Sequence, residues 1–243
     1  MGTETQTEQK KWRPLEKMFN EVPVRYDMLN RVITWRLDES WRKAAVRKCL
    51  EGEPSRVLDL CTGTGDLAIR MARQVSGQTK IQALDYSQPM LEVAREKAGK
   101  ANLKNIEFIQ GDAASMPLEN EDLDVIGISF AFRNLTYKNP DQEKFLQEIF
   151  RVLKPNGKFV IIESSQPENR LMKSLFRLYL KVFVAGIGGW LSGHKGAYRY
   201  LAASARNFYE PAEIKQFLSD TGFSMVEYRP FLGGIAGLTV ATK

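Results

Sequence analysis

Histidine and cysteine are scarce in this sequence, which has one histidine, His194, and two cysteines, Cys49 and Cys61, among 243 residues. A single imidazole excludes a metal site built from several histidines and any catalytic arrangement that needs two. Two cysteines cannot cross-link so long a chain as disulfides cross-link small secreted domains, so we expect a reducing, cytoplasmic setting. The remaining composition, 43% hydrophobic and 26% charged, is that of an ordinary globular protein.

Long apolar runs are also absent. A membrane-spanning helix needs about 18 to 20 consecutive apolar residues, and the nearest candidate, residues 171–190, is interrupted by Lys173, Arg177 and Lys181. Residues 1–11 are polar and are expected to form a disordered leader rather than a secretory signal. The sequence therefore predicts a protein that is soluble or lies on a membrane surface.

Acidic residues are missing from Asn169 to Tyr209, whereas the whole chain carries a formal charge of +6. This favours a local anionic partner and argues against a general nucleic-acid surface. Leu171, Leu175, Leu178 and Val182 recur at helical spacing in the same segment, which fits a helix lying in a membrane interface. The alternative is a helix packed on the fold with a solvated charged edge. The basic residues of the segment are Arg170, Lys173, Arg177, Lys181, Lys195, Arg199 and Arg206.

Short apolar runs alternate with helical patterns along most of the chain. Strands are predicted over 56–61, 80–84, 106–110, 123–130 and 158–163, with a closing pair over 223–229 and 237–242. Helices are predicted over 66–74, 88–100, 140–153 and 211–220. This alternation is typical of an α/β fold with a doubly wound, mostly parallel sheet.

A glycine-containing loop follows the first predicted strand and includes Gly63 and Gly65. Its spacing also matches a dinucleotide-binding turn, and glycines that merely turn the chain are a further alternative. Four aspartates stand at or near successive strand ends: Asp59, Asp66, Asp85 and Asp112.

Carboxylates repel a pyrophosphate but suit a cationic ligand that carries ribose hydroxyls. S-adenosylmethionine, with its sulfonium and ammonium groups, has this chemistry. We therefore expect Asp85 to accept from the ribose hydroxyls and Asp112 from the adenine amino group. Tyr86 and Met90 are expected to flank the adenine ring. For Asp85 the alternatives are helix capping or solvation.

Several motifs resemble class I S-adenosylmethionine-dependent methyltransferases, and more narrowly the ubiquinone/menaquinone biosynthesis C-methyltransferases, over roughly residues 18–242. The general motifs are Asp59-x-x-x-Gly63-x-Gly65, Asp85, Gly111-Asp112 and Leu153-Lys-Pro-x-Gly157. The narrower ones are Tyr26-Asp-x-x-Asn30 with Trp41, Ile128-Ser-Phe-x-x-Arg-Asn134, Arg151 to Ser165, and Tyr198-Arg-Tyr-Leu-Ala202. Departures from the family pattern include Asp38, where a histidine is usual.

The resemblance implies a Rossmann-like, seven-stranded sheet with helices on both faces. Residues 12–243 then form one domain, divided into an N-terminal helical lid (12–50), a donor-binding core (51–165), a helical segment facing the acceptor or membrane (166–210), and a closing helix and strands (211–243). Thr64, Asp85, Asp112, Ala113 and Ser129 match the family's donor-contacting positions.

Methyl transfer to a ring carbon also needs a proton acceptor, or a cation that stabilises a phenolate, on the acceptor side. Arg133 is the expected catalytic residue, a cation that stabilises a phenolate or orients water, with a structural ion pair as the alternative. Tyr26, with Asp27 and Asn30, is expected in the lid, although Tyr26 also suits core packing. His194 is a less favoured base. Further residues expected to bind the acceptor are Asn134, Tyr198, Arg199 and Tyr200, the last three with an ordinary packed helix as the alternative.

The predicted function is S-adenosylmethionine-dependent C-methylation of a prenylated quinol ring, without a metal. The enzyme is expected to be cytoplasmic, with peripheral membrane contact through residues 171–190 and a homodimer as a further expectation. One alternative keeps the donor and changes the acceptor to another small phenol, amine or lipid. Others are a non-catalytic binding module that retains a nucleotide-binding fold and, least favoured, an NAD-dependent oxidoreductase.

Overall fold

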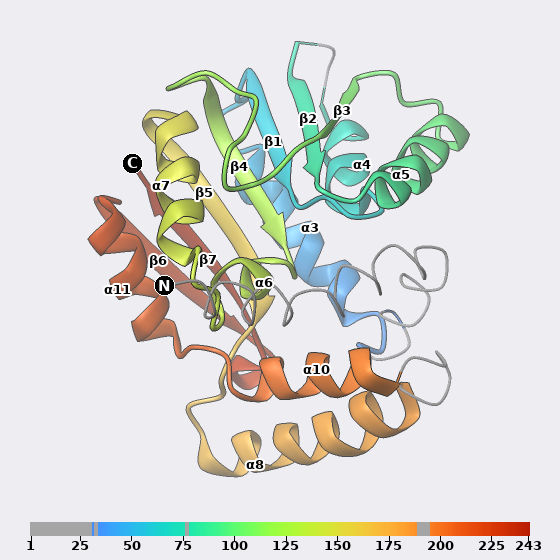
Figure 1. Cartoon of the computed structure of the whole chain (residues 1–243), viewed down its shortest axis with the longest axis vertical. Helices are drawn as coiled ribbons and strands as arrows, with labels where there is room; N and C mark the ends of the chain where they lie inside the picture. The colour runs from blue at the N-terminus through green and yellow to red at the C-terminus, as the bar shows by residue number, and fades with distance from the viewer. Residues whose placement is uncertain (1–30, 32–33, 76–77, 189–194) are drawn as a thin grey trace, which may run out of the picture.

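The computed structural model describes residues 31, 34–75, 78–188 and 195–243 (Figure 1). Seven strands form one sheet in the order β3-β2-β1-β4-β5-β7-β6. β1 to β5 run parallel, and β7 pairs antiparallel with both β5 and β6. The strands are β1 (Arg56–Leu60), β2 (Lys80–Asp85), β3 (Ile106–Gln110), β4 (Leu123–Ser129), β5 (Leu153–Ser164), β6 (Met225–Phe231) and β7 (Ala236–Thr242).

Helices cover both faces of this sheet. α7 and α11 pack with α6 in the apolar cluster on one face, and α3 and α4 pack in the cluster on the other. The predicted doubly wound α/β fold is thereby confirmed. The helices are α3 (Leu37–Cys49), α4 (Asp66–Ala72), α5 (Gln88–Lys100), α6 (Phe132–Thr136), α7 (Gln142–Val152), α8 (Arg170–Tyr179), the π-helix η1 (Leu180–Gly188), α10 (Lys195–Arg206), α11 (Pro211–Thr221) and the short 3-10 turn η2 (Leu232–Gly234).

Burial differs between the centre and the edges of the sheet. Four of the five residues of the interior strand β1 are buried, because helices cover it on both sides. The edge strand β6 shows no buried residue and alternates between exposed and half-buried positions over most of its length. The largely apolar strand β1, which Asp59 interrupts, therefore lies in the interior of the sheet.

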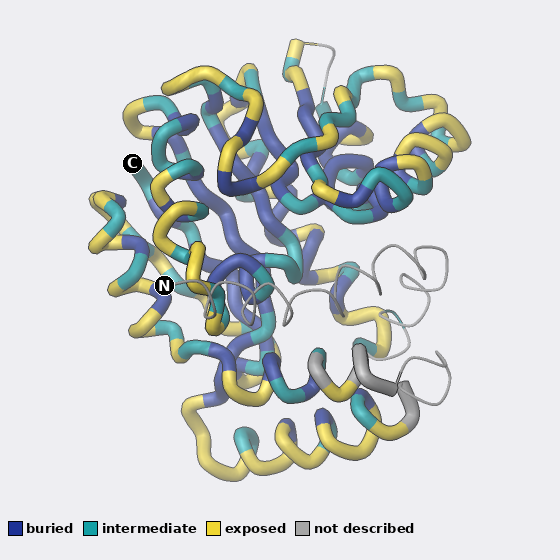
Figure 2. The backbone as a smooth tube through the Cα atoms, in the orientation of Figure 1, coloured by how far each residue is buried: buried dark blue, intermediate teal, exposed yellow. Residues whose placement is uncertain are grey.

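Two helical segments, α8 and α10, lie beyond the carboxyl ends of the parallel strands (Figure 1). They pack on each other and on η1 through a separate apolar cluster that contains Phe176, Leu180, Val184, Ala202 and Ala205. The outer side of α8 is exposed (Figure 2). Within the described ranges, no helix combines the length and apolar content needed to cross a bilayer.

Two elements differ from the sequence-based prediction. β5 begins at Leu153, directly after α7, whereas the predicted strand begins at Lys158. Leu153 pairs with Leu123 and Lys158 pairs with Val125, so the register shifts between these two pairs. Asn156, whose φ angle is 63°, lies in the intervening part of β5. The short helix α6 was not predicted, because five residues are too few to show a helical period.

Candidate functional site

The loop between β1 and α4 has a fixed shape that depends on its two glycines. Gly63 and Gly65 have φ angles of 55° and 81°, a region that favours glycine. A Cβ atom on Gly65 would lie 2.9 Å from the Cβ atom of Ala94 in α5, so the packing also requires glycine there. A Cβ atom on Gly63 would meet nothing within 4 Å. Gly63 therefore borders open space, where a ligand can approach the backbone.

Asp59 lies buried beneath this loop, one residue before the end of β1. Its Oδ2 atom accepts a hydrogen bond of 2.5 Å from the Thr62 hydroxyl and one of 2.9 Å from the Ala68 N–H. Burial raises the pKa of Asp59 to about 7, although these two hydrogen bonds oppose the shift. The side chain thus ties β1 to the first turn of α4. Its direct contact with a methyl donor stays a prediction.

Asp85 ends β2 and faces the same loop. Its Oδ2 atom accepts a hydrogen bond of 2.7 Å from the Gly63 N–H, and Oδ1 accepts one of 2.9 Å from the Ser87 N–H. Burial raises the pKa of Asp85, and the N–H groups of Ser87, Gly63 and Tyr86 work against this rise. Each carboxylate oxygen keeps further acceptor capacity. The group can therefore receive two neighbouring ribose hydroxyls, as the sequence predicts.

A surface cavity of about 510 Å³ lies between the ends of β2 and β3. Tyr86 lines it and is 63% exposed, and Asp112 lines it while its Oδ1 atom accepts a hydrogen bond of 2.8 Å from the Ala114 N–H. Met90 is buried and is not among the residues that line the cavity. Two of the three residues predicted to contact an adenine ring, Tyr86 and Asp112, therefore line this cavity. Contact with adenine stays a prediction for both of them and for Met90.

The other predicted donor-site residues follow the same edge of the sheet. Thr64 is buried in the glycine loop, and its hydroxyl accepts a hydrogen bond of 3.2 Å from Lys97. Ala113 packs in the apolar cluster beneath the strand ends. Ser129 ends β4, and its hydroxyl accepts a hydrogen bond of 3.0 Å from Nε of Arg42. The topology therefore gathers these residues, although contact with a donor stays a prediction for each.

These residues fit S-adenosylmethionine. Asp85 offers carboxylate oxygens to ribose hydroxyls, and Gly63 leaves the backbone open beside it. The neighbouring carboxylates would repel the pyrophosphate of a dinucleotide, which needs N–H donors around it. The chemistry of the loop thus favours a cationic donor.

A second cavity, of about 370 Å³, lies between the sheet edge and the helices α3, α8, η1 and α10. Its walls are mostly apolar. The charged side chains that line it are Asp38, Arg42 and Arg133. An apolar cavity with a few charged groups is suited to a largely apolar molecule with a polar head. The apolar walls include Trp41, Phe130, Met172, Phe176, Leu180 and Leu201.

Arg133 is buried in this cavity at the start of α6. Its Nη1 atom lies 3.1 Å from Oε1 of Glu163 and 2.6 Å from the hydroxyl of Ser164. Its buried Nε atom has no hydrogen-bond partner among the residues that the structure describes. The ion pair that the sequence analysis gives as the alternative is therefore present, and Arg133 is also among the residues that line the cavity.

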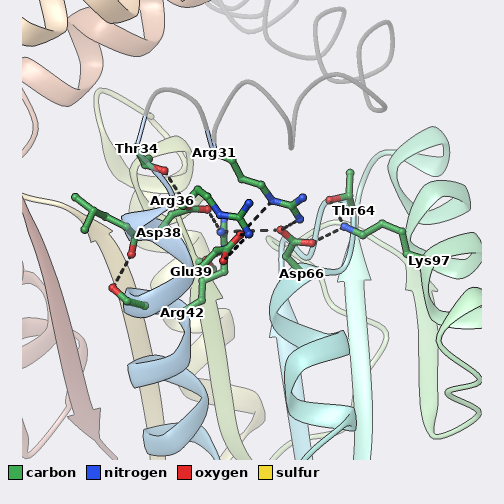
Figure 3. A network of polar contacts seen from close by, with 12 residues as sticks. Arg31, Thr34, Arg36, Asp38, Glu39, Arg42, Thr64, Asp66 and Lys97 are labelled. Carbon is green, nitrogen blue, oxygen red and sulfur yellow. Dashed lines mark hydrogen bonds and ion pairs between the residues drawn. The ribbon is translucent and has the colours of Figure 1, made fainter.

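A polar network joins α3 to the glycine loop (Figure 3). Arg42 forms an ion pair with Asp38, and its Nη1 atom lies 4.0 Å from Oδ2 of Asp66 at the start of α4. Asp66 also pairs with Lys97. Burial opposes ionisation of Asp66, but Lys97, Arg42 and Arg31 together outweigh it and lower its pKa. Among the predicted strand-end aspartates, Asp66 is thus engaged in a protein ion-pair network.

Arg42 was not singled out from the sequence, and Asp38 was noted only as a departure from the family pattern. The available signal was their spacing of four residues in a helical segment, which brings opposite charges together. Such pairs are usually solvated, and only the tertiary fold shows that this one is buried.

Several predicted acceptor residues fall elsewhere. Asn134 is half-buried in α6 and is not among the residues lining the second cavity. Arg199 is exposed on α10. The remaining predictions concern parts of the chain that the structure does not describe. These are the residues Tyr26, Asp27, Asn30 and His194 and the side chains of Tyr198 and Tyr200.

Comparisons with known proteins show which proteins this chain resembles. A demethylmenaquinone methyltransferase of Deinococcus radiodurans is 39% identical over 235 residues, covering 97% of this chain and 95% of the relative. One from Thermus thermophilus is 38% identical over 226 residues, covering 93% of this chain and all of the relative.

Solved structures share the fold. A SAM-dependent methyltransferase from Aquifex aeolicus aligns with a TM-score of 0.55 and 24% identity, over 77% of this chain and 81% of that one. Haemonchus contortus phosphoethanolamine N-methyltransferase 2, in complex with S-adenosyl-L-methionine, aligns with a TM-score of 0.59 and 15% identity, over 83% of this chain and 52% of that one.

The model of the ubiE/COQ5 methyltransferase family matches residues 4–243. The predictions of a methyltransferase and of S-adenosylmethionine as its methyl donor are confirmed. The chain belongs to the ubiE/COQ5 methyltransferase family.

Proposed function

We propose that this enzyme methylates a ring carbon of a prenylated quinol, converting demethylmenaquinol to menaquinol or acting on the equivalent ubiquinone precursor. The observation that carries the proposal is the apolar cavity that contains the buried Arg133. A prenyl chain needs apolar walls, and a quinol ring needs polar groups beside its hydroxyls. The names of the relatives, demethylmenaquinone methyltransferases, support the same acceptor.

S-adenosylmethionine supplies, when bound, an electrophilic methyl group on a positively charged sulfur. Gly63, Asp85 and the cavity at Tyr86 and Asp112 would hold it. The task left to the chain is to make a ring carbon nucleophilic and to exclude water. A quinol carbon gains nucleophilicity when a neighbouring hydroxyl loses its proton.

Arg133 suits the stabilisation of the resulting anion. Its guanidinium remains protonated and lies buried at the wall of the apolar cavity, a low-dielectric place where its positive charge acts strongly on a nearby anion. Glu163 and Ser164 fix the opposite side of the guanidinium, so little reorganisation is needed when charge develops on the ring oxygen.

We also propose peripheral contact with the cytoplasmic face of the membrane, through α8 and η1. Apolar side chains on their outer surface are strongly exposed beside Arg177 and Lys181, and the segment from Asn169 to Tyr209 lacks acidic residues. Prenylated quinols reside in the bilayer, so an enzyme that acts on them must reach it. The exposed apolar side chains are Leu171, Leu175, Leu178, Val182 and Phe183. The homodimer stays a prediction of the sequence.

The test is an assay with methyl-labelled donor and a panel of demethylated naphthoquinols, benzoquinols, simple phenols and amines. We expect labelled carbon-methylated product from a prenylated quinol, with weaker turnover of ring compounds that lack the chain. Methylation confined to amines or to hydroxyl oxygens would contradict the proposed acceptor. Calorimetric titration with S-adenosylmethionine separates both outcomes from a non-catalytic module, which would not bind the donor.

A further inference from the structure

The second cavity, which we propose holds the acceptor and call the acceptor cavity, contains a carboxylate to which no role has been assigned. Among the described residues that line it, Asp38 is the sole carboxylate, and it is 2% exposed. It lies in the first turn of α3, whereas Arg133 comes from α6, so two parts of the chain far apart in sequence bring opposite charges to one cavity.

The Asp38 side chain is held in place by neighbours. Oδ1 accepts a hydrogen bond of 2.6 Å from the Thr34 hydroxyl, and Oδ2 is paired with Nη1 of Arg42. Arg42 is fixed in turn by the Ser129 hydroxyl, 3.0 Å from Nε, and its guanidinium carbon lies 5.2 Å from the centre of the Phe130 ring. Each Asp38 oxygen keeps a further lone pair, so the carboxylate can accept from a ligand without losing these contacts.

A purely structural role explains this pair poorly. Burying an ion pair costs several kcal/mol of hydration free energy for each ion. The attraction between the two ions often does not offset this cost. A buried carboxylate at the wall of a cavity therefore invites a chemical explanation.

Other candidate proton acceptors near the cavity are less suited. Glu163 accepts from the Arg133 guanidinium and N–H and from the Ser164 N–H and hydroxyl, and it is not among the lining residues. Tyr179 lines the cavity, but burial raises the pKa of its phenol, which therefore stays protonated near neutral pH. Arginine cannot act as a base.

We propose that Asp38 takes the proton from the acceptor's ring hydroxyl during methyl transfer. The inference rests on the proposed quinol C-methylation. The O–H bond breaks and its proton moves to an Asp38 oxygen; the ring carbon bonds to the methyl group as the methyl–sulfur bond breaks, and that electron pair stays on sulfur. The ring carbon then loses its own proton to solvent, and Asp38 returns the first proton to the ring oxygen. One proton is released per methyl transferred.

The test compares the full-length enzyme with Asp38→Asn and Asp38→Ala, using the quinol that the wild-type enzyme methylates best. We expect kcat to fall about 100-fold in both, as for loss of a general base. The dissociation constant for S-adenosylmethionine should stay near the wild-type value. Added formate should restore part of the activity of Asp38→Ala and none in Asp38→Asn, because the shorter variant leaves room for a substitute carboxylate.

Glu39→Gln is the matched control. Glu39 is an acid of the same helix turn, it pairs with Arg36, and it does not line the cavity, so this variant should keep the wild-type kcat. With acceptors whose ring hydroxyls are more acidic, the difference in kcat between Asp38→Asn and the wild type should become smaller, because such hydroxyls depend less on a base. A structural defect would slow all acceptors alike.

The outcomes separate the two proposals. If the wild-type enzyme methylates no quinol, the proposed function fails, whatever the variants do. If the wild-type enzyme methylates a quinol, two results overturn the role of Asp38. One is a wild-type kcat in Asp38→Asn. The other is the absence of both formate rescue and the dependence on the acidity of the ring hydroxyl. If Asp38→Asn loses donor binding, the double variant Asp38→Asn/Arg42→Gln is measured in its place. This double variant removes both charges of the buried pair, so neither is left unpaired. A wild-type kcat in the double variant also overturns the inference.

Discussion

Asp85 and Asp59 are aspartates at neighbouring strand ends, and their hydrogen bonds give them different tasks. Asp85 accepts from two backbone N–H groups through separate oxygens and faces the glycine loop. Asp59 uses one oxygen twice, within the protein interior. The first arrangement leaves capacity for a ligand, whereas the second fixes the shape of the loop.

Replacing Asp85 with asparagine should weaken donor binding. The amide retains one acceptor oxygen, so one of two charge-assisted hydrogen bonds to the ribose is lost, at a cost of about 1.5 to 3 kcal/mol. We expect a dissociation constant for S-adenosylmethionine that rises between about 10- and 100-fold, measured by calorimetry. Glu92→Gln, at an exposed position of α5, is the control and should bind normally. An unchanged constant for Asp85→Asn would remove the ribose assignment.

Asp59 should make stability depend on pH. Its pKa of about 7 in the folded protein exceeds the ordinary 3.8, so between these values the folded protein retains a proton that the unfolded chain has lost. Rising pH across this window therefore lowers the free energy of unfolding. Asparagine does not titrate, so the free energy of unfolding of Asp59→Asn should not fall with pH for this reason.

The measurement is chemical denaturation of both proteins without ligand. From about pH 5 to about pH 8, the free energy of unfolding of the wild type should fall by about 2 to 3 kcal/mol relative to that of Asp59→Asn. Parallel pH curves for the two proteins would show that Asp59 does not titrate in this range.

At the level of elements, α8 has two sides with different surroundings. Phe176 is buried in the cluster formed with η1 and α10, whereas Leu171 and Leu178 are 71% and 58% exposed. The outer side of α8 is exposed (Figure 2). The regular spacing of cations along an apolar helix predicts this division. Exposed leucines beside cations are characteristic of helices that lie in a membrane interface.

The double variant Arg177→Glu/Lys181→Glu should therefore bind anionic liposomes less well. Each basic residue near an anionic surface contributes about 1 kcal/mol, and reversal of its charge adds repulsion. We expect the wild type to float with acidic liposomes at low salt and to dissociate as salt is raised, and the variant to remain unbound.

Arg73→Glu/Lys104→Glu is the matched control, because it changes the net charge equally at exposed positions of the donor-binding core. Equal flotation of both double variants would indicate that net charge, rather than α8, governs binding. Failure of the wild type to float at low salt would reject the membrane contact altogether.

At the scale of the whole molecule, both cavities open at the carboxyl edge of the sheet. β1 and β4 are neighbours there, and the chain leaves them in opposite directions across the sheet, toward β2 and toward β5. Such a reversal of strand order creates a crevice at the strand ends. The helices added beyond that edge, α8, η1 and α10, supply the apolar walls of the second cavity. The segment that contains α8, η1 and α10 therefore contributes both to the walls of the second cavity and to the exposed helix surface that carries Arg177 and Lys181.

The sequence by itself determined the parallel sheet, the glycine loop and Asp85, because each depends on local pattern: apolar strands, a turn that needs glycine, and a carboxylate at a strand end. Only the tertiary structure decided that Asp38 and Arg42 are buried, that Arg133 pairs with Glu163 across 30 residues, and that one apolar cavity is bordered by Asp38, Arg42 and Arg133. Burial and long-range pairing depend on how distant elements pack, and helical or strand periodicity carries no information about a partner beyond its own element.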